Sequence, residues 1–127
     1  MIKQVIVMRK DLNMRKGKMI AQGSHACLKI FFDRMYKCED SNEYILNTTP
    51  QIREWIEGLF TKICVSVNSI DELIEIYEKA LENQIPTSLI EDSGLTEFKG
   101  VKTITCCAIG PDDSEKIDKI TGHLSLL

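Results

Sequence analysis

The chain has 127 residues, of which 43% are hydrophobic and 28% are charged, and its formal net charge is −3. This length and composition fit one domain with one sizeable core, and we expect residues 1–127 to form it. No run of about 18 apolar residues occurs, so no segment is predicted to span a membrane. The start, MIKQVIVMRKD, lacks the long apolar stretch and the small-residue cleavage site of a signal peptide.

The net charge conceals an uneven distribution along the chain. Residues 1–37 carry nine Lys and Arg against two acidic residues (+7), whereas residues 38–127 carry seven against seventeen (−10). This asymmetry is typical of a basic face that binds a polyanion locally. The alternative is that the basic residues cluster by chance on a solvated surface. The overall acidity disfavours a protein that coats nucleic acid without specificity.

The five cysteines, at positions 27, 38, 64, 106 and 107, are odd in number and show no CxxC spacing. Cys106 and Cys107 are adjacent, so on a strand they would point to opposite faces. This pattern disfavours a disulfide framework and a zinc site, and it is typical of reduced thiols in a cytoplasmic protein. Buried, structural cysteine is the expectation for all five.

The first third of the chain predicts a strand and then a long helix. Residues 4–8, QVIVM, form an apolar run typical of a buried strand. A helical pattern follows from about Lys16 to Met35, and small residues within it would let the helix lie close to a sheet. The inward stripe of this helix is predicted to contain Ile20, Ser24, Cys27 and Phe31. Residues 37–49, KCEDSNEYILNTT, have no periodic pattern and predict a loop.

A short helix, a strand and a further helix are predicted next. Thr49 followed by Pro50 is typical of a helix start. The apolar side of this short helix is expected to contain Ile52, Trp55, Ile56 and Leu59. Residues 62–67, KICVSV, alternate as a strand does. Ser69 and Glu72 form a capping box that opens a helix to about Glu82, and its inward residues are predicted to be Leu73, Ile74, Tyr77 and Leu81.

The remaining residues predict two strands and a final helix. Pro86 precedes a strand over residues 87–92, TSLIED, and a Gly-containing loop leads to a strand over residues 103–110, TITCCAIG. Asp112 with Glu115 predicts the capped start of the last helix, and Gly122 is expected to end it.

This order of elements predicts an α/β fold. Crossovers of this length imply that the first three strands are parallel neighbours. The connection between the last two strands carries no helix and predicts an antiparallel pair. We therefore expect a three-layer α/β/α sandwich around a mixed four-stranded sheet.

No P-loop, GxGxxG, HExxH or GxSxG motif occurs, so candidate chemistry rests on polar residues at element ends. Lys18, Gln22, His25 and Lys29 share one stripe of the first helix. Lys18 lies in the first turn, where a cation opposes the helix dipole, and this favours a functional role. Arg15 and Lys16 beside it would help this helix end to attract a phosphate or an oxyanion. A solvated helix face is the alternative for the stripe, and a partly buried, hydrogen-bonded side chain is the expectation for His25.

The second cluster is DSGLT, from Asp92 to Thr96, directly after a predicted strand. Loops at the carboxyl ends of strands commonly carry the ligand site of α/β proteins. A hydrogen-bonded turn is the alternative for this stretch. Thr105, on the following strand, could face the same loop.

Together, VIVMRKDLNMRKGKMIAQGSHA, DSGLT and AIGPDDSEKIDKITGHLSLL resemble the archaeal/eukaryotic-type (type two) peptidyl-tRNA hydrolases. The resemblance covers roughly residues 2–32 and 87–127, while residues 37–49 look like an elongation. It implies that Lys18, Asp92 and Thr96 are catalytic. The family's second threonine falls on Thr105, one residue later than the usual spacing. Arg9 and Asp11 match the family's R-x-D element.

The resemblance implies hydrolysis of the ester that joins a peptide to tRNA, which recycles tRNA from stalled translation. On this hypothesis Asp92 orients or deprotonates a water, Lys18 stabilises the oxyanion, and Thr96 and Thr105 fix the Asp or the water. Arg9, Arg15 and Lys16 would hold phosphates of the tRNA. Gln22 and His25 would bind the peptide or the terminal ribose, or else brace the helix.

The expected enzyme needs no metal, no cofactor and no covalent nucleophile. Its expected partners are peptidyl-tRNA and, as the resemblance implies, a second copy in a homodimer. Two other functions stay open: an inactive tRNA- or protein-binding module of this fold, or a hydrolase of a different aminoacyl ester.

Overall fold

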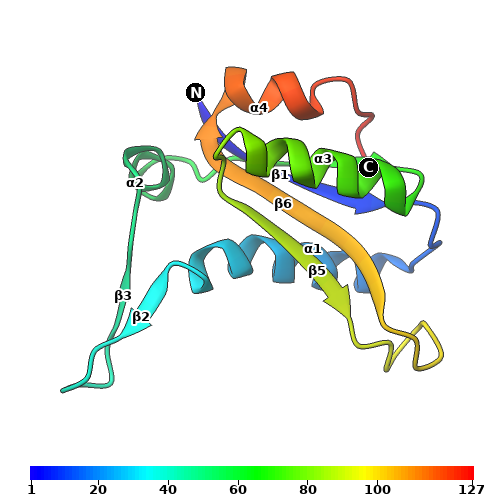
Figure 1. Ribbon diagram of the computed structural model, residues 1–127, viewed down its shortest axis with the longest axis horizontal. Helices are drawn as coiled ribbons and strands as arrows, with labels where there is room; N and C mark the ends of the chain where they lie inside the picture. Colours follow the sequence, from blue (N-terminus) through cyan, green and yellow to red (C-terminus); the bar gives the residue numbers. More distant parts are fainter.

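The computed structural model describes residues 1–127 and contains six strands and four helices (Figure 1). In chain order these are β1 (Ile2–Arg9), α1 (Lys16–Phe32), β2 (Met35–Lys37), β3 (Tyr44–Leu46), α2 (Pro50–Glu57), β4 (Lys62–Val67), α3 (Ile70–Glu82), β5 (Thr87–Asp92), β6 (Thr103–Asp113) and α4 (Ser114–Thr121). None of the helices combines the length and apolar character needed to cross a lipid bilayer.

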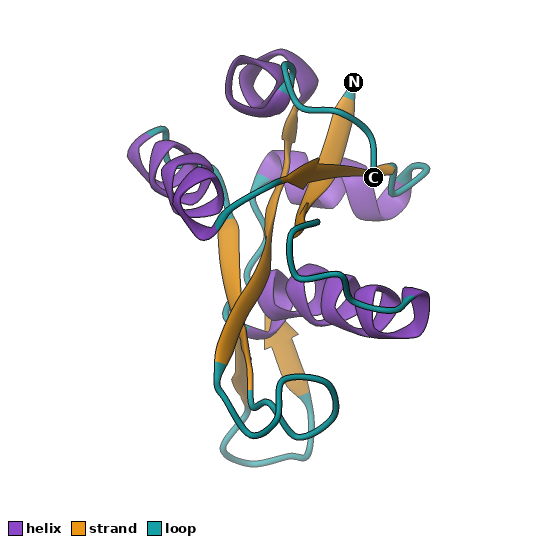
Figure 2. Ribbon diagram, turned by 90° about the vertical axis from the view of Figure 1, so that its right-hand side faces the viewer, coloured by secondary structure: helices purple, strands orange, loops and turns teal.

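Helices cover both faces of one four-stranded sheet (Figures 1 and 2). One face packs on α3 and α4 through a core that includes Leu73 and Ile117. The other face packs on α1 and α2 through a core that includes Ala26 and Trp55. The predicted three-layer α/β/α sandwich is therefore confirmed.

The strand order of the sheet is β4-β1-β6-β5. β1 pairs parallel with β4, and β5 pairs antiparallel with β6, as predicted. The prediction that β5 also neighbours a parallel strand is wrong, because β6 lies between β1 and β5 and pairs antiparallel with both. The length of a crossover predicts that the two strands it joins run in the same direction. It does not predict whether a later strand, here β6, lies between them in the sheet.

The buried face of α1 agrees with the predicted one at Phe31 and in part at Cys27, and differs elsewhere. Its buried residues are Gln22, Gly23, Ala26, Ile30 and Phe31, whereas Ile20 and Ser24 are exposed. A Cβ atom placed on Gly23 would lie 3.6 Å from the side chain of Ile6, an ordinary van der Waals contact, so α1 lies directly against β1 at this position. Apolar residues occur on both sides of α1, and periodicity alone therefore could not identify the side that faces the sheet.

The predicted loop after α1 contains a two-stranded ribbon. α1 ends at Phe32 rather than at Met35, and Met35 begins β2. β2 and β3 pair antiparallel, with Met35 opposite Leu46 and Lys37 opposite Tyr44, and the ribbon stands away from the main sheet (Figure 1). Strands of three residues are too short to show an alternating pattern, which explains why the sequence predicted a loop.

Two of the three predicted helix caps are confirmed. The hydroxyls of Thr49 and Ser69 each accept the backbone N–H three residues later, at 3.0 and 3.1 Å. The start predicted for α4 is wrong, because β6 continues through Asp113 and the residue before α4 makes no side-chain cap. Asp112 instead accepts the N–H of Asp113, at 2.7 Å. Gly122 follows the last residue of α4, as predicted.

The inward faces predicted for α2 and α3 are right in part. The buried residues of these helices are Ile52, Trp55, Leu73, Ile76 and Ala80. Ile56, Leu59 and Leu81, which were predicted to face inward, are exposed, and Ile74 and Tyr77 are half-buried. Each helix touches the sheet along one narrow stripe, so apolar residues at its borders remain in solvent.

The cysteines divide between the two cores and the surface. Cys106 and Cys107 are buried on opposite faces of the sheet, as predicted, and all five thiols are free. Burial raises the pKa of Cys106 to about 11 and raises the pKa of Cys107 as well. The expectation of burial is wrong for Cys64, which is exposed, and only partly right for Cys27 and Cys38. Cys64 lies on the edge strand β4, where it lines a hollow that α1 leaves open.

Candidate active site

Three residues predicted from two separate motifs meet at the carboxyl end of β5. Asp92 is the last residue of β5, and Lys18 lies in the first turn of α1. Lys18 Nζ donates to Asp92 Oδ1 at 2.8 Å and to Thr96 Oγ1 at 2.6 Å. The Lys18 and Asp92 side chains are each 11% exposed, so this ion pair is partly shielded from water. In Figure 1 the N-terminal end of α1 lies beside the loop that joins β5 to β6.

The carboxylate of Asp92 accepts two further hydrogen bonds. Gln22 Nε2 donates to Oδ1 at 3.1 Å, and the backbone N–H of Gly94 donates to Oδ2 at 2.9 Å. The hydrogen bond from Lys18 lowers the pKa of Asp92 most strongly, against the opposing effect of partial burial, and the bonds from Gly94 and Gln22 lower this pKa further. Asp92 is therefore an ionised carboxylate at neutral pH.

Gly94 is the only residue type that fits its place in the DSGLT loop. Its φ is +84°, and a Cβ atom there would lie 2.4 Å from the carbonyl oxygen of Val101. The same glycine accepts the N–H of Gly100 at 2.8 Å, which closes the loop. A side chain at this position would displace the loop backbone, and with it the N–H that holds Asp92.

Gln22 and Thr105 lie beneath the Lys18–Asp92 pair rather than in the wall of a pocket. Gln22 is 2% exposed, Thr105 is fully buried, and Thr105 Oγ1 donates to Gln22 Oε1. This bond orients the amide so that its NH₂ group faces Asp92, which can only accept. Thr105 is therefore connected to Asp92 only through Gln22.

A cleft of about 600 Å³ opens beside this cluster. It is lined by Leu12, Asn13, Arg15 and residues 94–100, a range that includes Thr96. The ring of Phe98 lies 5.6 Å from Lys18 Nζ. Phe98 was not among the residues predicted for the site; the only signal in the loop is a single aromatic side chain.

The predicted phosphate-binding residues differ in accessibility. The Arg15 side chain is exposed although its Nε donates to Glu97 Oε1 at 2.7 Å, and this bond is the main cause of a lowered pKa for Glu97. Lys16 is exposed and makes no ion pair. Arg9 is engaged with its own chain, because its guanidinium bonds to Asp11 and donates to a carbonyl oxygen of β6.

His25 and Lys29 occupy the exposed part of the predicted stripe. His25 is exposed and makes no hydrogen bond within the chain, so the expectation of a partly buried, bonded histidine is wrong. Lys29 pairs with Asp33 at 3.0 Å along the helix. Beyond Gln22, α1 still packs on β5, where Ser88 donates to the carbonyl oxygen of Ala26, but His25 and Lys29 point into solvent and form a solvated helix face.

The structure thus defines a class: an α/β protein with a Lys–Asp–Thr cluster and an open cleft at the carboxyl edge of its sheet, where such folds bind ligands. No three His, Cys, Asp or Glu side chains converge as metal ligands would. The donors and the carboxylate of the cluster are suited to orienting a water and to stabilising a developing negative charge.

A family model described as "Peptidyl-tRNA hydrolase PTH2" matches residues 2–127, and this chain belongs to that family. Proteins named peptidyl-tRNA hydrolase from Methanocaldococcus jannaschii and Methanothermobacter thermautotrophicus are 45% and 47% identical, over 99% of this chain and the whole of each relative. One from Sulfurisphaera tokodaii is 43% identical over 98% of both chains. The resemblance found in the sequence is therefore confirmed.

Proposed function

We propose that this protein hydrolyses the ester bond between a peptide, or an N-blocked aminoacyl group, and tRNA, and so recycles tRNA from stalled translation in the cytoplasm. The observation that carries the proposal is the hydrogen-bonded cluster of Lys18, Asp92 and Thr96 beside an open cleft. Membership of the PTH2 family and relatives named for this activity across the full chain support it.

Lys18 and Thr96 supply hydrogen-bond donors for the oxyanion. An ammonium group has three N–H donors, and Asp92 and Thr96 occupy two of them, which leaves one for the substrate. Thr96 accepts from Lys18, so its own hydroxyl hydrogen is also free to be donated. One such donor stabilises a tetrahedral transition state by about 3 kcal/mol.

Asp92 orients the attacking water, and as the water oxygen adds to the ester carbonyl its proton passes by way of the Asp92 carboxylate to the ribose oxygen that leaves. Its Oδ1 accepts two hydrogen bonds and its Oδ2 accepts one, so Oδ2 retains a lone pair for a water. Because its pKa is lowered, the carboxylate is a weak base, although it is fully ionised as an acceptor. A well-placed acceptor also holds the Lys18 ammonium in position.

Gln22, Thr105 and Arg9 are assigned positioning roles in this mechanism. Gln22 and Thr105 are buried under the cluster and aim the carboxylate of Asp92. Arg9 ties the carboxyl end of β1 to β6 through the carbonyl oxygen of Ile104, at 2.9 Å. Gln22 and Thr105 therefore affect the substrate only through Asp92, and Arg9 affects it only through the position of β1 relative to β6.

The acceptor-end phosphates of tRNA would bind at the N-terminal end of α1. Arg15 and Lys16 are exposed there, and the first turn of α1 has no acidic residue and no side-chain cap. The free backbone N–H groups and the helix dipole therefore reinforce the two cations. His25, which is exposed on the same helix, is available to a more distant part of the substrate.

We also propose that the protein acts as a homodimer, as the family resemblance implies. α1 exposes large apolar side chains, including Ile20 and Leu28, beside a hollow that Cys64 of β4 also lines. Exposed apolar residues on one helix face are typical of a surface that another protein covers.

The direct test is release of the labelled amino acid from N-acetylaminoacyl-tRNA, with and without a chelator. We expect equal rates in both conditions. A requirement for metal would contradict the proposed chemistry, and binding of the tRNA without release would favour the inactive binding module. Faster release from free aminoacyl-tRNA or D-aminoacyl-tRNA would favour a hydrolase of a different aminoacyl ester.

A further inference from the structure

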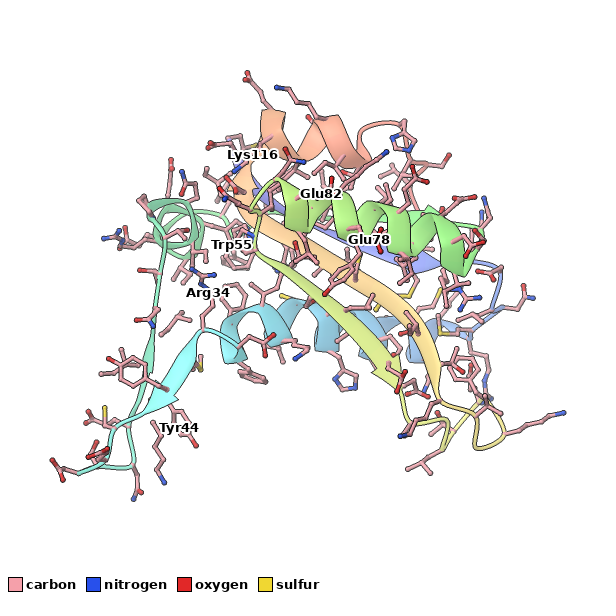
Figure 3. The ribbon with its side chains drawn as sticks, viewed as in Figure 1. Arg34, Tyr44, Trp55, Glu78, Glu82 and Lys116 are labelled. Atoms are coloured by element: carbon pink, nitrogen blue, oxygen red, sulfur yellow. The ribbon has the colours of Figure 1, made fainter.

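The ribbon of β2 and β3 with its turn, residues 35–46, is here called the arm. It stands away from the rest of the molecule, and Figure 3 shows Tyr44 on it, well apart from the sheet. Only its base packs on the core, through Met35 and Leu46. Tyr44 is 65% exposed, and Tyr36 and Ile45 are exposed as well. A two-stranded ribbon is only marginally stable alone, so the fold itself gives no reason for these exposed apolar side chains.

The arm is acidic. It carries Glu39, Asp40 and Glu43 against one Lys, Lys37, which gives a net charge of −2. None of the three carboxylates makes an ion pair within the chain. RNA is therefore a poor occupant, because its phosphates would be repelled. The composition fits a partner that offers both apolar surface and positive charge.

α1, which leads into the arm, has an uncharged ridge on its outer side. The ridge consists of Ile20, Ser24, Leu28 and Phe32, spaced four residues apart as in a row that packs against another helix. Ile20 is 70% exposed, and Leu28 and Phe32 are exposed as well. The ridge borders an apolar hollow of about 620 Å³, which Met19 and the exposed Cys64 also line.

The two ends of α1 carry exposed charges of opposite sign. Arg15 and Lys16 are exposed at the N-terminal end, which also has no acidic residue in its first turn. The acidic arm follows the C-terminal end, about 25 Å away for a helix of 17 residues. When two copies of such a ridge lie antiparallel, the positive end of each copy meets the negative end of the other, so the surface is complementary to itself.

We propose that a second copy of this chain packs antiparallel on the ridge of α1, so that each arm lies against the N-terminal end of α1 in the other copy. The acidic turn of each arm then faces Arg15 and Lys16 of the second copy. This inference rests on the proposed homodimer and identifies its interface. A parallel arrangement would bring like charges together, whereas a two-fold axis across the ridge creates both contacts at once.

The arrangement leaves the cleft accessible. Ile20 lies about 160° around α1 from Lys18, since successive residues of a helix are about 100° apart. Lys18 faces the Asp92 side of the helix, and the ridge faces the opposite flank. The arm of the second copy therefore approaches the rim of the site, at Arg15 and Lys16, rather than the reacting groups.

A charge-swap experiment tests the interface by light scattering after size exclusion, at low salt and over a concentration series. One variant carries Glu39→Lys, Asp40→Lys and Glu43→Lys, and the other carries Arg15→Glu and Lys16→Glu. Each variant alone should dimerise at least tenfold more weakly than the wild type. An equimolar mixture should restore the dimer, because both contacts in the mixed pair are again complementary.

A matched control carries Glu54→Lys, Glu57→Lys and Glu78→Lys, three exposed acidic residues on α2 and α3. It should dimerise as the wild type does. A monomeric wild type, an undiminished dimer in the arm variant, or a mixture that stays monomeric would overturn the inference. Hydrolysis of N-acetylaminoacyl-tRNA by the wild type and the arm variant distinguishes the two proposals. An active monomer contradicts only the interface, and an inactive dimer contradicts only the proposed function.

Discussion

At the scale of single residues, the site depends on one carboxylate that accepts three hydrogen bonds. Asp92 receives them from Lys18 and Gln22, which lie one turn apart on α1, and from the backbone of Gly94 in its own loop. The donors lower the pKa of Asp92 and fix the direction of its free lone pair. Substitutions of the donors should therefore alter both stability and the pH dependence of hydrolysis.

We expect Asp92→Asn to lower the free energy of unfolding at pH 7 by about 1–3 kcal/mol, because it removes a charged acceptor from a partly buried cluster. The pKa of Asp92 is lower in the folded chain than the ordinary 3.8, so its stabilising effect is complete above pH 3.8. It is lost as the pH falls through the lowered value. Urea unfolding at pH 7 and below pH 3.8 should show a smaller difference between variant and wild type at the acidic pH. An equal difference at both would contradict the assigned ion pair.

We expect Thr105→Val to lower kcat while KM stays nearly constant, because Thr105 acts on Asp92 only through Gln22. Thr105→Ser, which keeps the hydroxyl, should restore most of the activity. Gln22→Met removes a donor to Asp92, raises its pKa and should move the acid limb of the pH profile upward. In the double variant Gln22→Met with Thr105→Val, the losses should fall short of additive. Fully additive losses would show that Thr105 acts independently.

At the scale of elements, the loop between β5 and β6 places the reactive groups by its backbone geometry. Gly94 and Gly100 both have positive φ, +84° and +82°, but only Gly94 lies against another segment. A Cβ atom at Gly100 would meet nothing within 4 Å. The two glycines thus separate the effect of backbone strain from the effect of a collision.

We expect Gly94→Ala to reduce hydrolysis by at least tenfold, because the added methyl group collides with Val101 and displaces the N–H that holds Asp92. Gly100→Ala is the matched control, and it should cost only the strain of its positive φ, of order 1–3 kcal/mol in stability. Steady-state kinetics and thermal unfolding of both variants provide the comparison. Similar losses of activity in the two variants would contradict the role of the close contact.

The elements also show which features the sequence made predictable. Lys18, Asp92 and Thr96 could be found because each lies in a short motif at the end of a strand or helix. The role of Gln22 could not, because it depends on Thr105, 83 positions away. The arm was missed because its strands are three residues long, and the position of β6 was missed because local patterns do not determine strand order.

At the scale of the whole molecule, the sheet separates two cores and leaves the basic end of α1 beside the cleft. The early part of the chain carries the excess of positive charge, and Arg15 and Lys16 of this part lie exposed at the end of α1 where the substrate would enter. The acidic remainder, including α3 and its exposed glutamates, repels RNA from other faces (Figure 3). Binding of tRNA should therefore be local and sensitive to salt.

We expect the affinity for tRNA to fall as salt rises, with a slope on a log–log plot that reflects the number of phosphate contacts. Arg15→Ala and Lys16→Ala should each reduce that slope by about 0.7–1. Lys119→Ala, an exposed lysine on α4, should leave the slope unchanged. Filter binding between 50 and 200 mM salt measures these values, roughly the range in which such contacts are lost. Equal slopes in all three variants would place the tRNA elsewhere.

We infer that Lys18 and Asp92 perform the hydrolysis in this α/β fold. The decisive experiment measures kcat/KM for N-acetylaminoacyl-tRNA in Lys18→Ala and Asp92→Asn, with folding checked by circular dichroism. We predict that each variant loses about 100-fold or more, as expected when one oxyanion donor or its positioning partner is removed. Folded variants that hydrolyse the substrate at the wild-type rate would contradict the account.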